Sequence, residues 1–396
     1  MTAAPLSAEA AAVQDRVRSA AASRTPLRLA GRGAWLDAGR PVRAAERLSL
    51  AETAGIVDYV PGDLTMTVRA GTTLGEIAAA AGAEGQWLAL DPPGRDDGTI
   101  GATAATASAG PLAHGFGLPR DNVLGLEFVD GTGAVVRGGG RVVKNVAGFD
   151  LTRLLVGSWG TLGAITEVTV RLRALPAREL TLALALPDPS ERGGAPLRDT
   201  LAALRAAPLA AWALEAVNPE LAASLGLGDA PVALARVGGN EELVRAQHDA
   251  LRAIGGDVRE VDSSVWARLR ACEPERAIVL RYSWPPAQLA ENCARLFAHR
   301  PREASDAPPA PLMHASLGRG VLRCIVPLPD SPADARRRLL LPRLIPDASG
   351  TRIFERLPGP LWTELGIPPA AGDRLSRGIK AKFDPAGVLN PGILGE

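Results

Sequence analysis

The chain has 396 residues, of which 46% are hydrophobic and 22% charged, which is enough for two cores of ordinary domain size. Its formal net charge of +1 gives no electrostatic reason to expect a nucleic acid or an anionic membrane surface as a partner. The cysteines Cys272, Cys293 and Cys324 lie far apart without Cys-x-x-Cys spacing, so the sequence supports neither a disulfide framework nor an iron–sulfur or zinc site.

The N-terminal segment Met1–Asp15 is rich in alanine, but it contains no basic stretch followed by an apolar one. The sequence therefore gives no sign of a secretion signal. No run of about 18 apolar residues, the length needed to span a bilayer, occurs anywhere in the chain. We expect a cytoplasmic, reduced protein without a transmembrane segment.

A helix is predicted over Ser7–Ala22, and the first strands follow it up to about residue 57. Within these first strands, a short apolar run leads into Gly31-Arg32-Gly33-Ala34, where a Gly-x-Gly turn could wrap a pyrophosphate with main-chain N–H donors. An ordinary strand turn is the alternative interpretation of this segment. Next, an alternating strand within Pro61–Ala70 ends in a glycine turn and precedes an alanine-rich helix around Glu76–Ala81.

Two further glycine-rich segments follow in chain order. The first is Gly98–Gly110, after which Arg120-Asp121-Asn122 opens a strand that runs to Val129. The second is Gly157-Ser-Trp-Gly160-Thr-Leu-Gly163, which repeats glycine every three residues between an amphipathic segment and a strand. Glycine is used where the backbone needs a positive φ or approaches a ligand closely, so this segment predicts a cofactor cradle. A tight helix-to-strand turn is the alternative.

In this order the segments resemble the FAD-binding domain of the vanillyl-alcohol oxidase/PCMH-type flavoprotein superfamily, and most specifically the FAD-binding subunits of bacterial glycolate oxidases. The resemblance covers about residues 25 to 176 and rests on GRGAWLDAGRP, VDYVPGDLTMTVRAGTTLGEI, GTIGATAATASAGP, RDNVLGLEFVDGTGAVVRGGGRVVKNVAGFD and GSWGTLGAITEVTVRLRALP. The phrase KNVAGFDLTRLLVGS points to this subunit in particular. Later in the chain the resemblance rests on VWARLR and on the ending KFDPAGVLNPG, which supports the superfamily more than the subunit.

The resemblance implies a non-covalently bound FAD, whose ring accepts a hydride while the protein binds and orients it. It assigns the pyrophosphate loop to Gly31, Arg32, Gly33 and Ala34, a second loop to Gly98, Thr99, Ile100, Gly101, Ser108 and Gly110, and contacts with the adenosine and pyrophosphate side to Gly157, Gly160, Thr161, Gly163 and Ile165. Arg120 and Asp121 are further cofactor candidates, although a salt bridge or a loop cap would explain them equally well. Gly31-Arg32-Gly33-Ala34 replaces the more usual run of three glycines and a serine, and Gly101-Ala102 replaces a Gly-Gly pair. An alanine at positive φ would be strained by roughly 1 kcal/mol or more, which would weaken flavin binding.

These observations predict an α+β fold. A PCMH-type, two-subdomain FAD-binding domain is expected over residues 1–176, an α+β cap domain over 177–375, and a C-terminal segment, 376–396, that packs back on the FAD domain. Within the cap we expect helices over Leu197–Ala206 and Glu241–Ile254, strands over Leu180–Ala185, Val232–Val237 and Ala277–Tyr282, and a loop over Arg302–Pro311. Trp266, Arg268, Arg270 and Trp284 could line a pocket or an interface, but core packing explains the two aromatic residues equally well.

Several other sites are disfavoured. Gly31-Arg-Gly33-Ala-Trp-Leu36 lacks the third glycine of a Gly-x-Gly-x-x-Gly fingerprint, and no Gly-x-x-x-x-Gly-Lys-[Ser/Thr] run occurs, so classical NAD and nucleoside-triphosphate sites are not supported.

The histidines His114, His248, His299 and His314 lack the motif context of a metal site or of a histidyl-bound flavin, so neither is expected. His114 is nevertheless the candidate catalytic residue, because its glycine-rich loop passes near the flavin in the resembled superfamily and its pKa range suits an acid or base. A partly exposed loop histidine is the alternative. Lys144 could neutralise flavin or phosphate charge, or simply begin a helix.

No acid/base pair for a substrate is recognisable in the sequence. In the resembled complex, oxidation of the 2-hydroxy acid is attributed to a larger flavin subunit, and an iron–sulfur subunit carries the electrons onward. We therefore expect an FAD-binding subunit of such a heteromeric complex that participates in the oxidation of glycolate or a related 2-hydroxy acid. Two alternatives stay open: a free-standing FAD-dependent oxidoreductase of a small hydroxy acid or alcohol, which would need His114 or an unrecognised cap residue for catalysis, and a non-catalytic scaffold subunit that keeps the flavin fold.

Overall fold

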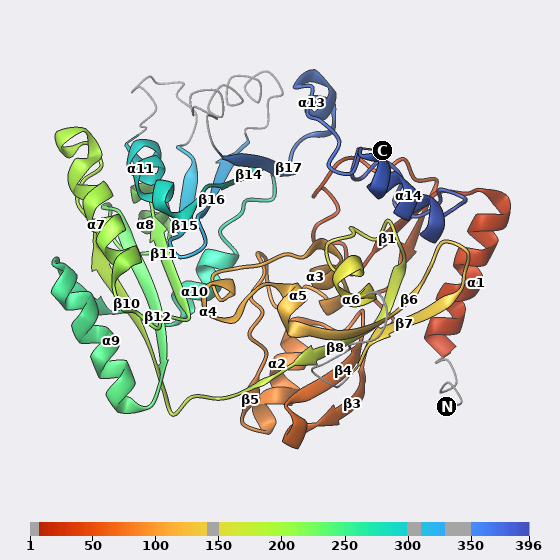
Figure 1. Ribbon diagram of the computed structural model, residues 1–396, viewed down its shortest axis with the longest axis horizontal. Helices are drawn as coiled ribbons and strands as arrows, with labels where there is room; N and C mark the ends of the chain where they lie inside the picture. The colour runs from red at the N-terminus through yellow and green to blue at the C-terminus, as the bar shows by residue number, and fades with distance from the viewer. Residues whose placement is uncertain (1–7, 141–149, 299–309, 329–349, 396) are drawn as a thin grey trace. The chain divides into compact units, whose positions relative to one another are not determined.

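The computed structural model describes residues 8–140, 150–298, 310–328 and 350–395. The chain divides into two compact units (Figure 1): unit 1 comprises Met1–Gly110, Phe116–Leu175 and Pro358–Glu396, and unit 2 comprises Pro111–Gly115 and Pro176–Leu357. Most of the predicted loop Arg302–Pro311 lies outside the described residues.

Unit 1 is built from three small sheets and the helices around them. Its helices are α1 (Ala8–Ser23), the 3₁₀ turn η1 (Pro61–Asp63), α2 (Leu74–Ala83), α3 (Ile100–Thr106), α5 (Pro119–Asn122), α6 (Leu151–Leu155), α13 (Gly359–Glu364) and α14 (Arg374–Phe383). Its strands are β1 (Leu27–Ala30), β2 (Glu46–Ser49), β3 (Ile56–Val60), β4 (Thr65–Arg69), β5 (Gln86–Trp87), β6 (Val123–Val129), β7 (Val135–Gly139), β8 (Ala164–Arg171) and β9 (Arg173–Ala174). Strands β1 and β2 are parallel, β5 pairs with β9, and a five-stranded antiparallel sheet has the order β3-β4-β8-β6-β7.

The turn from β4 into α2 shows how the sequence shapes unit 1. A Cβ added at Gly71 would lie 2.6 Å from the carbonyl oxygen of Ala51, so only glycine fits there. Thr73 then caps α2 through a reciprocal capping box, in which its hydroxyl accepts from the N–H of Glu76 at 3.1 Å and its own N–H donates to the Glu76 carboxylate at 2.7 Å. The predicted helix around Glu76–Ala81 is confirmed, as is the N-terminal helix, which is described from Ala8 and ends at Ser23, one residue later than predicted.

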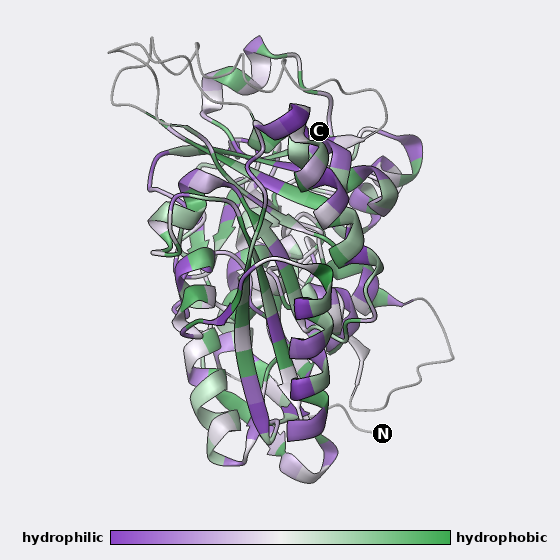
Figure 2. Cartoon of the chain, turned by 90° about the vertical axis from the view of Figure 1, so that its left-hand side faces the viewer, coloured by the Kyte–Doolittle hydropathy of each residue, from purple (hydrophilic) through white to green (hydrophobic). Residues whose placement is uncertain are grey.

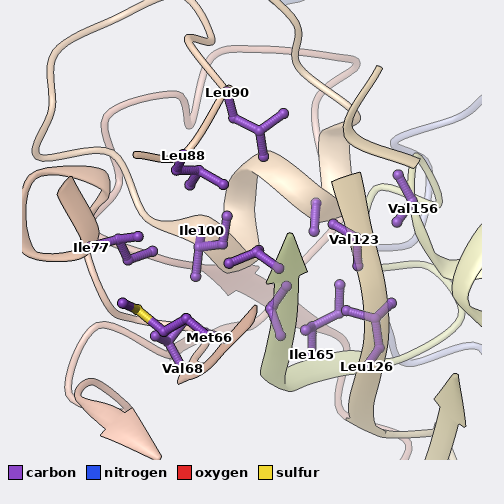
Figure 3. Close-up of a cluster of buried hydrophobic side chains, with 14 of the residues drawn as sticks. Met66, Val68, Ile77, Leu88, Leu90, Ile100, Val123, Leu126, Val156 and Ile165 are labelled. Carbon is purple, nitrogen blue, oxygen red and sulfur yellow. The ribbon is translucent and has the colours of Figure 1, made fainter. Parts of the chain in front are cut away.

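The core of unit 1 is formed by side chains from β4, β6, β8, α2 and α3 (Figure 3). Met66, Ile77 and Ile100 are completely buried in it. Full burial of an aliphatic side chain contributes about 1.5–3 kcal/mol, so this cluster holds α3 firmly against the sheet. The glycine-rich segments that adjoin α3 are therefore positioned by a rigid core.

Unit 2 is one antiparallel sheet with helices packed against it. Its helices are η2 (Glu191–Gly194), α7 (Ala195–Ala206), α8 (Pro219–Ser224), α9 (Glu241–Ile254), α10 (Ser264–Arg270) and α11 (Pro286–Phe297), and α4 (Ala113–Phe116) begins in this unit. Its strands are β10 (Arg178–Ala185), β11 (Ala213–Val217), β12 (Val232–Gly239), β13 (Val258–Glu260), β14 (Ala277–Ser283), β15 (Leu312–Ser316), β16 (Val321–Pro327) and β17 (Thr351–Arg356). The strand order is β13-β10-β12-β11-β15-β16-β14-β17.

The helices and strands predicted for this region are confirmed. Asn240 caps α9 at its N-terminus, and Gly255 follows its last residue, as the sequence signals for a helix start and stop require. Figure 2 shows hydrophilic and hydrophobic residues interleaved along the helices of unit 2, as expected where one face packs on a sheet. The two aromatic pocket candidates pack in the interior instead: Trp266 donates to the Thr181 hydroxyl at 2.9 Å, and Trp284 stacks on Tyr282. Within the described ranges, no helix is long and apolar enough to cross a membrane.

Candidate functional site

The first glycine-rich loop follows β1 directly. The main-chain N–H groups of Gly31, Arg32, Gly33 and Ala34 have no hydrogen-bond acceptor among the described residues. Gly33 adopts a φ of +88°, a conformation that favours glycine. A Cβ added at Gly31 would collide with the hydroxyl of Thr99, which places the first and second predicted loops against each other. Consecutive free N–H groups of this kind can bind an anion.

The second loop turns into α3. Thr99 caps this helix by accepting from the N–H of Ala102 at 3.3 Å, and the N–H of Gly101 donates to the carbonyl of Ala70 at 2.9 Å. A Cβ at Gly101 would lie 2.8 Å from that same carbonyl oxygen, so glycine is needed here for close packing of α3 on the end of β4. The side chain of Ile100 is completely buried in the core. Because the Ile100 side chain is buried, only the backbone of this predicted site residue is available to a ligand.

The remaining residues predicted for the second loop are held by local contacts. The hydroxyl of Ser108 lies 2.6 Å from that of Thr106. Gly110 packs so closely on the backbone of Asp91 that a Cβ there would overlap its carbonyl oxygen. Gly98 accepts through its carbonyl from the N–H of Leu74 at 2.9 Å. The contacts of Ser108, Gly110 and Gly98 therefore lie within the protein and set the conformation of the second loop.

The third segment, 157–163, is tied to the C-terminal end of α3. The N–H groups of Gly157 and Trp159 donate to the carbonyls of Ala104 and Ala105 at 3.0 and 2.7 Å. Gly157 and Gly160 have φ values of +88° and +69°. The three predicted segments therefore all lie around α3.

The other residues of the third segment make contacts within unit 1. Thr161 donates through its hydroxyl to the carbonyl of Ser158 at 2.7 Å, whereas Gly163 packs on Phe128 and Ile165 is buried in the core. The hydroxyl of Ser158 is buried and has no partner in the described part of the chain. Ser158 lies in the glycine-rich segment but is not among the site residues predicted from the sequence, and its unpaired buried hydroxyl marks it as a further candidate for a cofactor contact.

Asn390, from the C-terminal motif KFDPAGVLNPG, joins two of the segments. Its side-chain oxygen accepts from the N–H of Leu29 at 2.7 Å, just before the first loop. Its amide nitrogen donates to the carbonyl of Trp159 at 2.7 Å, inside the third segment. The motif thus has a definite structural role, which sequence reasoning did not assign to this residue.

The strain expected where these two segments depart from the usual pattern is absent. Neither Ala34 nor Ala102 has a positive φ, and Ala102 lies inside α3. The left-handed conformations fall instead on Ala107, with φ 51°, and Trp159, with φ 55°. The expectation was wrong because the helix begins at Ile100, which gives position 102 ordinary helical geometry.

Arg120 and Asp121 lie in the short helix α5. The carboxylate of Asp121 accepts from the N–H of Leu118 at 2.8 Å, so it caps its own turn. Arg120 is exposed and forms no ion pair with the described residues. Lys144 and His299 lie outside the described residues.

His114 lies in unit 2, partly buried, with its ring packed against the backbone of Gly318. Its Nδ1 is buried and has no partner in the described part of the chain. Burial lowers the pKa of His114, and Arg319 lowers it further, while Glu215 acts in the opposite direction. The neutral ring, which can accept a proton, is therefore favoured.

A buried acid/base pair lies on the sheet of unit 2. Strand register places Val217 opposite His314 and Glu215 opposite Ser316, so Glu215 and His314 share one face of the sheet. Nδ1 of His314 lies 2.7 Å from Oε2 of Glu215, and the two residues are 8% and 1% exposed. Because a carboxylate only accepts hydrogen bonds, Nδ1 of His314 is the donor in this contact, and the contact orients the ring.

Sequence reasoning found no such pair. Its members are 99 residues apart, and neither belongs to a motif. The available signal was Glu215 itself, a carboxylate within the apolar strand sequence Ala-Leu-Glu-Ala-Val, since a buried charge needs a partner.

An ionic network adjoins this pair on the same sheet. Arg323, directly opposite His314 on β16, donates to Glu273 at 2.6 Å and to Glu355 at 2.9 Å. Arg356 and Arg281 pair with the same two carboxylates. Burial alone would lower the pKa of Arg323, but the two carboxylates more than offset this and raise it. Within the described ranges, no cluster of three or more histidine, cysteine or acidic residues could hold a metal ion.

The comparisons with known proteins agree with this geometry. Residues 5–139 match the family model of the FAD binding domain. The chain is 40% identical over 172 residues to the glycolate oxidase subunit GlcE of Escherichia coli (strain K12), covering 43% of this chain and 49% of that protein. It is 30% identical over 341 residues to the mitochondrial D-lactate dehydrogenase [cytochrome] of Arabidopsis thaliana, covering 78% of this chain and 58% of that protein. The matches thus span roughly half the length of these relatives.

The solved structure of 4-ethylphenol oxidase from Gulosibacter chungangensis superposes with a TM-score of 0.69 at 18% identity, covering 98% of this chain and 87% of that one. At this level of identity the likeness shows the fold. The predicted α+β fold of the PCMH type is confirmed.

The glycine-rich loops fit a bound FAD, because they present consecutive free donors and an unpaired buried hydroxyl around one helix. The chain therefore contains an FAD-binding domain and is homologous to glycolate oxidase subunits, and its cofactor is FAD.

Proposed function

We propose that this chain is an FAD-binding oxidoreductase subunit that takes part in the oxidation of glycolate or a related 2-hydroxy acid within a glycolate oxidase-type complex. The observation that carries the proposal is the convergence of three glycine-rich segments on α3, with free main-chain donors at residues 31–34. The names of the similar proteins, a glycolate oxidase subunit and a D-lactate dehydrogenase, support a 2-hydroxy acid as the substrate class.

In this proposal unit 1 serves the cofactor, and unit 2, which begins and ends at other residues than the predicted cap 177–375, takes the role of the cap. FAD, when bound, supplies the hydride acceptor. The chain's own contribution is to bind the diphosphate through main-chain donors of the residue 31–34 loop, without a covalent link, and to hold the ring through the segments around α3. These assignments predict that flavin will leave the protein when it is denatured by acid.

The test begins with the visible absorption spectrum of the purified chain before and after acid precipitation. Flavin bands that pass into the supernatant, at about one FAD per chain, would support a non-covalent flavoprotein subunit. A protein that stays colourless and takes up no added FAD would refute the proposal and favour a scaffold that keeps the fold alone.

The partners proposed are a larger catalytic flavin subunit and an iron–sulfur subunit. The support is that the E. coli relative is named as a subunit. The three chains from one organism would be co-expressed with a tag on this chain only, and glycolate-dependent dye reduction would be measured with each chain omitted in turn. Full activity of the other two chains alone would contradict a role for this one.

The second candidate is a free-standing FAD-dependent oxidoreductase of a small hydroxy acid, and the pair Glu215–His314 favours it. A substrate hydroxyl must lose a proton as its carbon loses a hydride, and Nε2 of His314 could accept that proton while Glu215 stabilises the resulting imidazolium. Turnover of glycolate or D-lactate by the isolated chain with a dye acceptor would select this candidate. No turnover alone, but activity with partner chains, would select the first.

A further inference from the structure

Two arginines face each other across the parallel strands that lead to the first glycine-rich loop. Arg28 on β1 is in register with Arg47 on β2. Their neighbours Leu27, Leu29 and Leu48 pack into a hydrophobic cluster. Because side chains alternate between the faces of a strand, the two guanidinium groups lie together on the opposite face.

Both side chains contact the loop of residues 31–36. Nη2 of Arg28 donates to the carbonyl of Leu36 at 3.2 Å. The guanidinium of Arg47 lies so close to Gly33 that a Cβ added there would be 2.6 Å from its Nη2. Two cationic groups therefore lie beside the free N–H groups of residues 31–34.

The two cations have no counter-ion in the described part of the chain. Neither Arg28 nor Arg47 forms a salt bridge there, and Nη1 of Arg28 is buried without a hydrogen-bond partner. Burial lowers the pKa of Arg28, and the charge of Arg47 lowers it further. Two guanidinium groups on paired residues, one of which has a buried N–H donor without a partner, form the arrangement expected of an anion site. An anion would accept a hydrogen bond from that donor and would offset the repulsion between the two positive charges.

We propose that Arg28 and Arg47 would bind the diphosphate of FAD together with the main-chain donors of the residue 31–34 loop. The inference rests on FAD as the cofactor, and it adds two side chains to the main-chain donors of the Gly-x-Gly loop. A diphosphate matches the site because it offers separate anionic oxygens to two planar guanidinium groups, which bind phosphate in a bidentate way. The competing explanation is that both arginines only brace the loop.

Titration of the FAD-free protein with FAD, followed by flavin fluorescence, separates these explanations without any activity measurement. The variants are Arg28→Gln, Arg47→Gln and the double variant, with Arg178→Gln as a matched control, since Arg178 pairs with Glu241 on the surface of unit 2. We expect each single variant to raise the FAD dissociation constant about 10- to 100-fold, the loss of a charge-assisted hydrogen bond, and the control to leave it unchanged. Arg28→Lys, which keeps the charge, should restore part of the affinity.

Ionic strength supplies the readout that a bracing role would not change. Screening weakens contacts between charges, so the dissociation constant of the unaltered protein should rise with salt, and that of the double variant should rise much less. An unchanged FAD affinity in both single variants would overturn the proposal. So would a loss of affinity with an unaltered salt dependence, which would indicate that the arginines only support the loop. Wild-type protein that bound no FAD at all would overturn the cofactor assignment itself, and the two failures are thereby distinguished.

Discussion

Replacement of Arg323 by methionine tests the buried ionic network of unit 2. The side chain of Arg323 is 7% exposed, and it contacts Glu273 at 2.6 Å and Glu355 at 2.7 Å. Removal of one partner of a buried ion pair costs about 3–5 kcal/mol, because the remaining charge stays desolvated. Glu273 and Glu355 each keep one other guanidinium, from Arg356 and Arg281, so we expect the lower end, about 3 kcal/mol.

Calorimetry of the purified chain measures this effect. For a unit of this size about 1 kcal/mol lowers the melting temperature by roughly 2–4 °C, so Arg323→Met should lower the transition of unit 2 by about 6–12 °C. Arg281→Gln is the matched control, because the Arg281 side chain is 34% exposed and, among the described residues, forms an ion pair with Glu355 only; this substitution should cost about 1 kcal/mol or less.

The stability lost in Arg323→Met should depend on pH with a definite sign. Burial alone would raise the pKa of Glu355, but Arg323 and Arg281 together bring it below its ordinary value. A depressed carboxylate pKa contributes stability above the unfolded value of about 4.3, and this contribution is lost as the pH falls through the folded-state pKa. The penalty of Arg323→Met should therefore shrink in acid. A loss below about 1 kcal/mol at neutral pH, or a penalty that grew on acidification, would refute the reasoning.

Three further predictions follow from individual side chains. Glu215→Gln removes the charge that orients His314, so we expect turnover of the 2-hydroxy acid substrate to fall about 100-fold or more in steady-state kinetics if this pair is the base, with the melting temperature nearly unchanged. Gly33 has a φ of +88°, so Gly33→Ala should weaken FAD binding about fivefold in a fluorescence titration. Gly62→Ala, where an added Cβ meets no other atom, should leave FAD binding unchanged. Equal FAD affinities of the two variants would show that the loop of residues 31–34 does not bind the cofactor. Burial raises the pKa of the Cys272 thiol to about 12, so iodoacetamide should label the folded protein far more slowly than the denatured one at neutral pH, and equal rates would contradict that burial.

The fold could be predicted because its signals are local. Helix α9 coincides with the predicted Glu241–Ile254 because a capping asparagine precedes it and a glycine follows it. The glycine-rich segments were found for the same reason, since each is a short run whose residues act through their own backbone. At positions 101 and 110 the structure adds a reason for glycine that the sequence could not show, namely close packing on the backbones of Ala70 and Asp91.

Contacts between side chains that are far apart in the sequence could not be predicted. Arg28 and Arg47 become neighbours through parallel pairing of two strands, and Glu215 and His314 through the register of β11 with β15. A one-residue shift in register would send one member of either pair to the other face, so composition and spacing carry no information about the contact. The prediction of strain at Ala102 was wrong for a related reason, because the φ of this residue depends on where α3 begins.

The polar row on the sheet of unit 2 argues that this sheet does more than support the fold. His314, Arg323 and Arg281 lie opposite one another on β15, β16 and β14, on the same face as Glu215. Stability alone does not explain such a row, because well-packed apolar residues of similar volume are often as stabilising as a buried ion pair or more so. His314 instead has its Nδ1 held by one buried carboxylate, and its neighbour Arg323 is held by two others. This is the arrangement that the second candidate function uses, in which Nε2 of His314 would receive the proton of the substrate hydroxyl.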